Sequence, residues 1–232
     1  YQSNSSTKEP IKWRVLSVEG NEAFVVADMA LNCKRYNETF EKVTWETCTL
    51  RQWLNSTFLD AAFDAEEKSA IKTTTVVDED NAHYSTEEEI TTSDKIFLLS
   101  QNEVTNPSYG FNSEYYTESE TRQCKASVYA VENECWVSSS DGYAGNCCWW
   151  LRSPSYGGYG TDIAEVSSDG RVSYGAANVD DDYNGVRPAL NLNLSSSLWT
   201  YAGTVSANVG EESGEDSKKP VVTLKPDVVS DD

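Results

Sequence analysis

Short segments with a strand-like composition stand near the beginning of this chain. Residues 11–16 and 23–31 are rich in β-forming residues, and Gly20 and Asn21 separate them. A short connection of this kind between two such segments is typical of a β-hairpin. We therefore predict that the folded part of the chain begins with two antiparallel strands.

Two more strand patterns stand in the C-terminal half. Residues 190–194 alternate leucine with asparagine, which is the period of a strand with one buried face. Asp169 and Gly170 lie between the β-type segments 162–166 and 171–174. An Asp-Gly pair in this position predicts a tight hairpin.

Helical spacing and helix-start signals occur in three places. Residues 49–58 have large hydrophobic side chains at helical intervals, namely Leu50, Trp53, Leu54 and Phe58. Asp64 followed by Glu67, and Ser100 followed by Glu103, match the capping box that begins a helix.

The segments between these elements have less regular patterns. Residues 73–77, 96–99 and 149–152 predict short strands, the last of them buried. Residues 78–92 are polar and acidic, which indicates a loop. Residues 106–122 are rich in Tyr, Ser and Glu, and we expect them to form a long surface excursion.

The composition is that of a folded and strongly acidic protein. Hydrophobic residues make up 38% of the 232 residues, including 7 Trp, 13 Tyr and 6 Phe, which is enough for a core. With 38 acidic residues against 18 Lys and Arg, the net charge is −20. Such a surface repels phosphate groups, so we expect neither nucleic-acid binding nor attraction to anionic membranes. No apolar run reaches the roughly 18 residues of a membrane-spanning helix, so no membrane insertion is expected.

We expect one domain, over residues 11–202. Residues 1–10 are a polar leader without a signal-peptide pattern, typical of a mature secreted fragment. Residues 203–232 are expected to be an acidic linker or tail, in which 221–224 have the composition of one more strand. An extracellular or cell-surface location is the corresponding expectation.

The cysteines form an even set, which suggests disulfides in an exported protein. They are Cys33, Cys48, Cys124, Cys135, Cys147 and Cys148. Spacing favours Cys33 with Cys48, and Cys124 with Cys135 or Cys147. Adjacent residues of a strand point to opposite faces, so Cys147 and Cys148 are not expected to pair. The alternative is that the thiols are buried and free.

Residues 153–185 form the most distinctive segment. Of its 33 residues, 22 are Ser, Gly, Tyr, Asp or Asn. As in antibody paratopes, tyrosine supplies contact area at a low entropy cost, and small polar residues supply adaptable hydrogen bonds. The alternative is a solvated connection whose tyrosines cover the edge of the core. Structureless loops longer than about 12 residues tend to be functional or disordered.

Five phrases in this order resemble one family. They are residues 11–16 (IKWRVL), 50–55 (LRQWLN), 94–100 (DKIFLLS), 149–154 (WWLRSP) and 185–190 (GVRPAL). Over about residues 11–200, the chain resembles an uncharacterised domain family of exported proteins from gut Firmicutes. That family is similar to C-type-lectin-like folds, including the variable proteins of diversity-generating retroelements and formylglycine-generating-enzyme-like proteins.

The resemblance implies an α+β fold of the C-type-lectin-like type, with a twisted antiparallel sheet, two helices and long loops. In the variable proteins, the ligand contacts lie between a Trp-Leu-Arg-Ser-like strand and a Val-Arg-Pro-like strand, which corresponds here to residues 155–184. The ligand-binding residues implied by position are Tyr156, Tyr159, Tyr174, Asn178, Asp180, Asp182, Tyr183 and Asn184.

Arg152 and Arg187 stand at matching points of the two strands that bracket this segment. One interpretation makes them clamps for an anion or a carboxylate. We favour the other interpretation, in which they are half-buried structural arginines paired with acids such as Glu165.

One stretch of the segment has part of a calcium-binding pattern. The first half of an EF-hand loop is matched by Asp180, Asp182, Asn184 and Gly185. The twelfth position is Asn191 instead of a glutamate, and Pro188 argues against the helix that should follow. We therefore predict no metal and no cofactor, with weak Ca²⁺ binding as the alternative.

Catalytic patterns are weak. His83 is the only histidine and lies in the acidic loop, and a Ser-His-Asp or Cys-His site would need it. The sequence has no nucleophile-elbow motif and no Cys/His zinc spacing. A glycosidase needs two facing carboxylates, and 38 acidic residues will always offer some pair. We predict no catalytic residues.

The predicted function is non-enzymatic recognition of a protein or a carbohydrate at a bacterial cell surface. The predicted site is the loop face of residues 155–184. The first alternative is a Ca²⁺-assisted carbohydrate-binding module. The second is an enzyme of the formylglycine-generating-like or hydrolytic type.

Overall fold

A computed structural model gives the structure. It describes residues 2–4, 7–78, 90–155, 160–172, 177–196, 199–206 and 218–224. Two five-stranded sheets, two strand pairs and several short helices form a mixed α+β fold, which confirms the predicted class.

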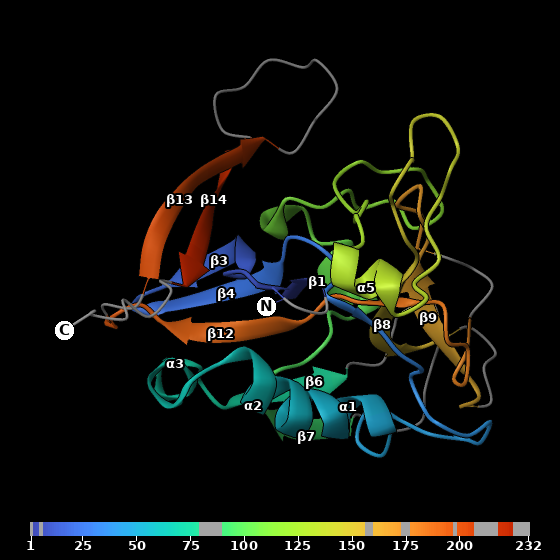
Figure 1. Ribbon diagram of the computed structural model, residues 1–232, viewed down its shortest axis with the longest axis horizontal. Coiled ribbons are helices and arrows are strands. Elements are labelled where there is room, and N and C mark those ends of the chain that lie inside the picture. The colour runs from blue at the N-terminus through green and yellow to red at the C-terminus, as the bar shows by residue number, and fades with distance from the viewer. Residues whose placement is uncertain are drawn as a thin grey trace.

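The first sheet carries the N-terminal hairpin at its centre (Figure 1). Its strands, in spatial order, are β12 (Ala189–Asn193), β4 (Glu22–Ala27), β3 (Lys12–Glu19), β14 (Lys218–Leu224) and β13 (Trp199–Ser206). Every neighbouring pair in this sheet is antiparallel.

Local sequence signals explain the hairpin and the edge strand β12. Glu19 pairs with Glu22 across the turn, and Gly20 has a φ of 58°, in the left-handed region that glycine enters at little cost. In β12, Leu190 and Leu192 are buried, as the alternating pattern predicts. Both predictions are confirmed.

The predicted end of the domain at residue 202 falls inside β13, a strand that continues to Ser206. Residues 218–224, which were placed in the tail, form β14 between β13 and β3. The leader also contains regular structure, because β1 (Gln2–Asn4) pairs with β2 (Thr7–Lys8). Backbone pairing, which composition does not report, joins β13 and β14 to the first sheet, whereas β1 and β2 form a separate two-stranded sheet.

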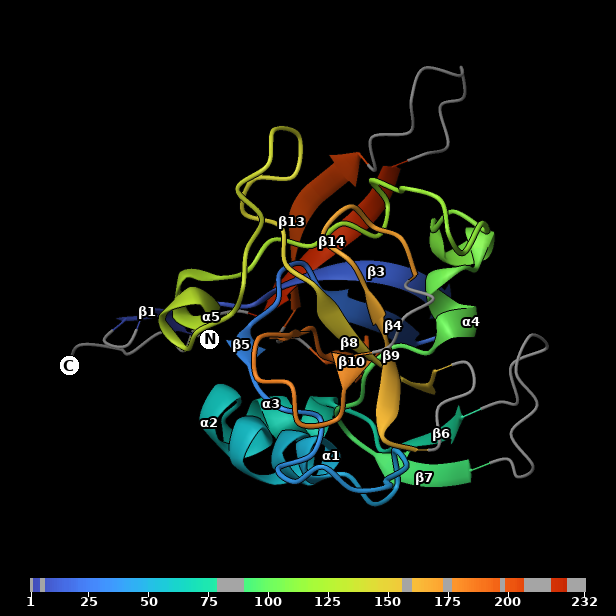
Figure 2. The same cartoon turned by 90° about the vertical axis from the view of Figure 1, so that its right-hand side faces the viewer.

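The second sheet contains the phrase 149–154 and the first two residues of the phrase 185–190, which together bracket the Tyr/Ser/Gly-rich segment (Figure 2). Its order is β10 (Ala177–Asn178), β9 (Asp162–Val166), β8 (Trp149–Pro154), β11 (Gly185–Val186) and β5 (Asn32–Cys33). β8 and β11 are parallel neighbours, while the other pairs are antiparallel. The predicted frame around the segment is therefore present.

A continuous helical stretch covers the lower side of the molecule in Figure 1, next to a strand pair. It consists of α1 (Thr49–Trp53), the π-helical turn η1 (Leu54–Phe58) and α2 (Leu59–Ala62). The predicted apolar stripe is buried through Leu50, Leu54 and Phe58. α3 (Ala65–Ala70) follows and begins with the predicted capping box of Asp64 and Glu67.

Asn55, within η1, ties this helical stretch to the segment after β7. Its Oδ1 atom accepts hydrogen bonds from the backbone N–H groups of Lys95 (2.8 Å) and Ile96 (3.1 Å). Its Nδ2 atom donates to the carbonyl oxygens of Ile96 (2.8 Å) and Arg51 (3.1 Å). One side chain thus satisfies four backbone groups.

The strand pair of β6 (Thr74–Asp78) and β7 (Ile90–Asp94) lies beside these helices. The predicted loop 78–92 is therefore shorter than expected, because the residues at both of its ends belong to strands. Its middle, with His83, lies outside the described residues. Residues 96–99 are buried but form only one isolated bridge, between Phe97 and Ala189.

Three short helices complete the described part. They are α4 (Gln101–Val104), the 3₁₀ turn η2 (Pro107–Tyr109) and α5 (Val128–Glu132). α4 begins with the predicted capping box, in which Ser100 and Glu103 cap each other's backbone. Among the described residues, no helix has the length and apolarity needed to cross a membrane.

The expected surface excursion at 106–122 is largely exposed, and it is wrapped around one buried arginine. Arg122 is completely buried and donates to the carbonyl oxygens of Gly170 (2.6 Å), Glu114 (2.7 Å) and Thr117 (2.9 Å). Burial lowers its pKa. A guanidinium group has five donors, so it can organise an irregular segment that lacks strands of its own.

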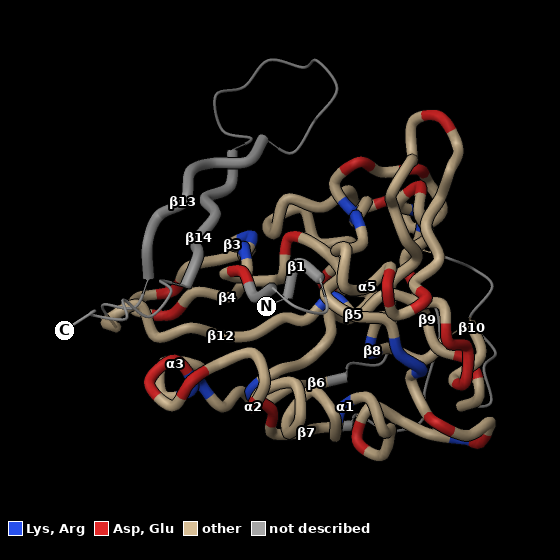
Figure 3. The backbone as a smooth tube through the Cα atoms, in the orientation of Figure 1, with Lys and Arg blue, Asp and Glu red and all other residues tan. Residues whose placement is uncertain are grey.

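Four tryptophans form the largest buried side chains of the core, namely Trp13, Trp45, Trp149 and Trp150. Figure 3 shows that acidic residues lie mostly in loops and helix ends around this core. The negative charge therefore lies around the core and not within it, as the composition suggests.

Candidate functional site

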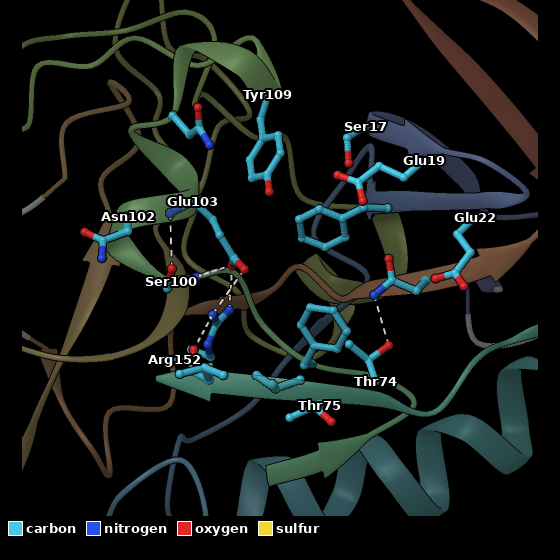
Figure 4. A pocket seen from close by; sticks show the side chains of 16 residues that line it. Ser17, Glu19, Glu22, Thr74, Thr75, Ser100, Asn102, Glu103, Tyr109 and Arg152 are labelled. Atoms are coloured by element: carbon cyan, nitrogen blue, oxygen red, sulfur yellow. Dashed lines mark hydrogen bonds and ion pairs between the residues drawn. The ribbon is translucent and has the colours of Figure 1, made fainter. Parts of the chain in front are cut away.

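A pocket of about 450 Å³ opens beside the first sheet (Figure 4). Strands β3, β4 and β12 contribute one wall, β6 another, and the region of α4 and η2 a third. Its volume lies in the range of small-molecule sites.

One wall is a row of side chains across three strands. Phe24 of β4 pairs with Ser17 of β3 on one side and with Asn191 of β12 on the other. Residues directly opposite one another in an antiparallel sheet share a face. The row therefore presents a hydroxyl, an aromatic ring and an amide side by side.

Aromatic rings continue from this row. The Phe24 ring stacks on Phe97, with centroids 5.8 Å apart and an interplanar angle of 22°. Tyr109 of η2 meets Phe24 edge-on at 5.4 Å and 79°. Figure 4 shows Tyr109 on the side of the pocket opposite Thr74 and Thr75. Such clusters give a pocket an apolar surface with a polar tip where tyrosine ends.

Neutral hydroxyl and amide groups make up most of the polar lining. Their residues are Ser17, Thr74, Thr75, Ser100, Asn102, Asn106 and Asn191. Asn191 donates from Nδ2 to Oγ1 of Thr74 at 2.9 Å, which holds β12 to β6. The Asn106 side chain accepts from the N–H of Ser108 at 2.9 Å and so caps η2.

Charged groups in the pocket are largely bound to one another. Arg152 donates to both carboxylate oxygens of Glu103, at 2.6 and 3.1 Å. The same guanidinium donates to the carbonyl oxygens of Leu98 (2.8 Å) and Val77 (2.9 Å). At the other end, Glu22 forms an ion pair with Lys72 of the segment before β6.

Both arginines are buried, as the favoured structural interpretation predicts, and the acidic partner of Arg152 is not Glu165. Arg152 is buried against Glu103. Arg187 is buried with its guanidinium 4.9 Å above the Trp149 ring, and its Nε donates to Ala27 O at 2.8 Å. Glu165, the expected partner, instead accepts from Asn184, and burial raises its pKa.

Part of the predicted loop face lies around the turn between β10 and β11. Asn178 and Asp182 are exposed, Tyr183 is 42% exposed, and Asp180 is half-buried. Asp181, which the sequence did not single out, organises the turn. Its Oδ2 atom accepts from the N–H of Asn178 (2.8 Å) and from the Tyr183 hydroxyl (3.0 Å). Burial and this hydrogen bond raise the pKa of Tyr183 to about 12.

The prediction that Asn184 contacts a ligand on this face is corrected. Asn184 is 0% exposed, and its Nδ2 donates to Glu165 at 2.8 Å. It points inward because strand β11 begins at the next residue. Tyr156, Tyr159 and Tyr174 lie outside the described residues.

An exposed tryptophan that the sequence did not point to stands next to this turn. The side chain of Trp136 is 50% exposed, and its backbone N–H donates to the carbonyl oxygen of Tyr183 at 3.1 Å. The two residues are 47 positions apart in the sequence, so only the fold brings them together.

The residues that match the EF-hand pattern do not converge on one point at this turn, as calcium ligands would. Asp182 pairs with Arg35 at 3.1 Å, whereas Asn184 points into the protein. Across the described ranges, no three His, Cys, Asp or Glu side chains are arranged to hold a metal ion.

The sequence did not predict the pocket because its lining comes from widely separated segments. One local signal could have indicated it. Phe24 occupies the face of β4 opposite the buried Val25, and Asn191 occupies the polar face of β12. A large aromatic residue on the polar face of a strand marks a site that something else covers or binds.

Comparisons with known proteins place the chain in a family. Searches of curated proteins and of solved structures found no match. The family model described as "Domain of unknown function (DUF6273)" matches residues 20–194, which include β4, β6 and β12 of the pocket but not β3, and both strands that bracket the loop face. The chain is therefore a member of the DUF6273 domain family.

Proposed function

We propose that this protein is a non-enzymatic binding module for a carbohydrate, and that the pocket beside the first sheet is its site. The observation that carries the proposal is the row of Ser17, Phe24 and Asn191, flanked by Phe97 and Tyr109.

Sugar rings have an apolar C–H face and a rim of hydroxyl groups. Aromatic rings such as Phe24 and Tyr109 suit the apolar face. Hydroxyl and amide groups can donate and accept, which matches sugar hydroxyls of either orientation. Seven neutral polar residues in the lining fit this requirement.

Charge narrows the ligand class further. The chain carries a net charge of −20, and Glu19 and Glu22 line the pocket. Negative potential at a pocket disfavours anionic ligands. We therefore propose a neutral sugar in preference to an acidic one.

Asn191→Ala tests the pocket. We expect this change to weaken carbohydrate binding by about three- to tenfold, because one neutral hydrogen bond contributes about 0.5–1.5 kcal/mol. A glycan array with the intact chain identifies the sugar, and titration calorimetry then measures the affinity of each variant.

Asn193→Ala is the matched control, because Asn193 lies two residues further along the same strand and is exposed. It should leave the affinity unchanged. The pocket proposal would be contradicted if no neutral glycan binds, or if both asparagine variants bind as tightly as the unchanged protein.

The second candidate is recognition of a protein through the loop face, which the sequence predicted. The exposed Trp136 beside Tyr183 supports it, since aromatic residues with a polar tip are enriched in protein interfaces. Loss of binding in Tyr183→Ala but not in Asn191→Ala would move the site to this turn. A C-type-lectin-like relationship and a cell-surface location belong to this proposal, in which residues between β8 and β11 carry the contacts.

An enzymatic role has less support among the described residues. The pocket carboxylate nearest the arginine, Glu103, is bound to Arg152 through both oxygens. A carboxylate held in this way is a poor general base.

A further inference from the structure

Four of the six cysteines gather at one place beneath the turn of Asp182 and Tyr183. The strand β5, the segments around residues 124 and 147, and the turn after α5 meet there. Cys33, Cys124, Cys135 and Cys147 are all buried. All six cysteines are thiols in the structure.

Cys124 and Cys147 stand directly opposite each other. Lys125 and Asn146 form an antiparallel bridge, and the next residues of that register are Cys124 and Cys147. The N–H of Cys147 donates to the carbonyl oxygen of Cys124 at 2.9 Å. Opposite residues of this type have Cα atoms about 5.5 Å apart, which is near the usual value for a disulfide.

Cys33 and Cys135 meet on the other side of the cluster. The Cys33 thiol donates to the carbonyl oxygens of Asp182 (3.2 Å) and Asn184 (3.3 Å). Tyr183, between them, accepts from the N–H of Trp136, the residue after Cys135. The Cys33 and Cys135 side chains also lie within interaction range of each other.

The four sulfurs form a row, in which Cys33 and Cys124 stand at the ends. Each end sulfur has only one neighbour in the row with which it can pair. The Cys135 side chain interacts with those of Cys33 and Cys147, and the Cys147 side chain interacts with those of Cys135 and Cys124. Only one arrangement joins every sulfur to a neighbour, namely Cys33 with Cys135 and Cys124 with Cys147. A central Cys135–Cys147 bond would leave both ends unpaired.

Gly185 provides the space for this row. It lies opposite Cys33 in the β11–β5 pair, and a Cβ atom there would lie 3.0 Å from the Cys147 sulfur. The other two cysteines lie apart from the row. The Cys48 sulfur caps α1 by accepting from the N–H of Arg51, and Cys148 follows Cys147 in an extended segment, where neighbours point to opposite faces.

We propose that this cluster is a site of oxidation, at which two disulfides form, Cys33–Cys135 and Cys124–Cys147, while Cys48 and Cys148 remain thiols. The pairing differs from the predicted Cys33–Cys48. It agrees with one of the two partners predicted for Cys124.

The oxidant we propose is a small-molecule disulfide of the glutathione class, acting as the chain folds. In the first pair, the Cys135 thiolate is the nucleophile. It attacks the small disulfide and releases one thiolate. Cys33 then loses its proton and attacks the Cys135 sulfur, which releases the second thiolate. Cys124 and Cys147 react in the same way, so each protein disulfide reduces one small disulfide to two thiols.

Peptide mapping of the full chain tests the proposal. The protein is refolded in oxidised and reduced glutathione, alkylated in denaturant without reduction, and digested. Trypsin alone leaves Cys135, Cys147 and Cys148 in one peptide, because no Lys or Arg lies between residues 126 and 151. Chymotrypsin, which cleaves after Tyr143, separates Cys135 from the other two. The variant Cys148→Ser assigns the remaining bond to Cys147.

We expect linked peptides for the two proposed pairs, alkylated Cys48 and Cys148, and the same links in Cys148→Ser. Reduction with dithiothreitol should lower the Tm of the oxidised protein by about 10 °C or more. Six alkylated cysteines after refolding, a Cys33–Cys48 or Cys135–Cys147 link, or one zinc ion per chain by elemental analysis would overturn the proposal.

Discussion

Glu103→Ala is expected to destabilise the protein by about 3–5 kcal/mol. The substitution leaves the buried guanidinium of Arg152 without its carboxylate, and breaking a buried ion pair from one side costs this much. It also removes one half of the capping box of α4. Urea unfolding followed by tryptophan fluorescence measures the loss.

The second capping box of the chain supplies the control. Glu67 caps α3 as Glu103 caps α4, and both residues are half-buried. Glu67→Ala should cost only about 1 kcal/mol, the usual effect of losing a cap. Equal losses in the two variants would show that Arg152 is not held by its carboxylate. The double change Glu103→Ala/Arg152→Met should recover part of the lost stability, because it removes the unpaired charge.

Gly170→Ala is expected to cost about 3 kcal/mol or more. Gly170 has a φ of 85°, and a Cβ atom at this position would lie 2.0 Å from the carbonyl oxygen of Ser119. That oxygen belongs to the backbone, so it can yield only if the loop around Arg122 moves. Overpacking costs about 1–3 kcal/mol and adds to the cost of the left-handed conformation. Thermal unfolding of the variant measures the sum.

Gly142→Ala separates the two contributions. Gly142 has a similar φ of 88°, but nothing lies within 4 Å of its added Cβ atom. It should therefore cost only about 1 kcal/mol, from the backbone conformation alone. If Gly170→Ala lowers the free energy of unfolding no more than Gly142→Ala does, the close approach of Ser119 does not affect the stability.

The sequence predicted those parts of the fold that depend on neighbouring residues. The turn at Gly20, the capping boxes at Asp64 and Ser100, and the alternation in 190–194 each involve groups a few positions apart. Their physical causes act locally, so the chain shows them directly. The parallel pairing of β8 with β11 was not predicted, because it joins residues that lie far apart in the sequence.

The features that the sequence did not predict depend on contacts between distant residues. Ser17, Phe24 and Asn191 become one row only when β12 pairs with β4. Trp136 meets Tyr183 through a single backbone hydrogen bond between loops. Composition identified a polar, tyrosine-rich segment, but it could not show that Asn184 would point inward.

The four hydrogen bonds of Asn55 bear on how the protein should be produced. Asn55, Ser56 and Thr57 form an acceptor site for N-linked glycans in eukaryotic secretory hosts. A glycan attached to Nδ2 would disrupt the hydrogen bonds to Ile96 and Arg51. It would also place a bulky group between η1 and the segment after β7. Expression in a bacterial host avoids that modification and keeps this junction intact.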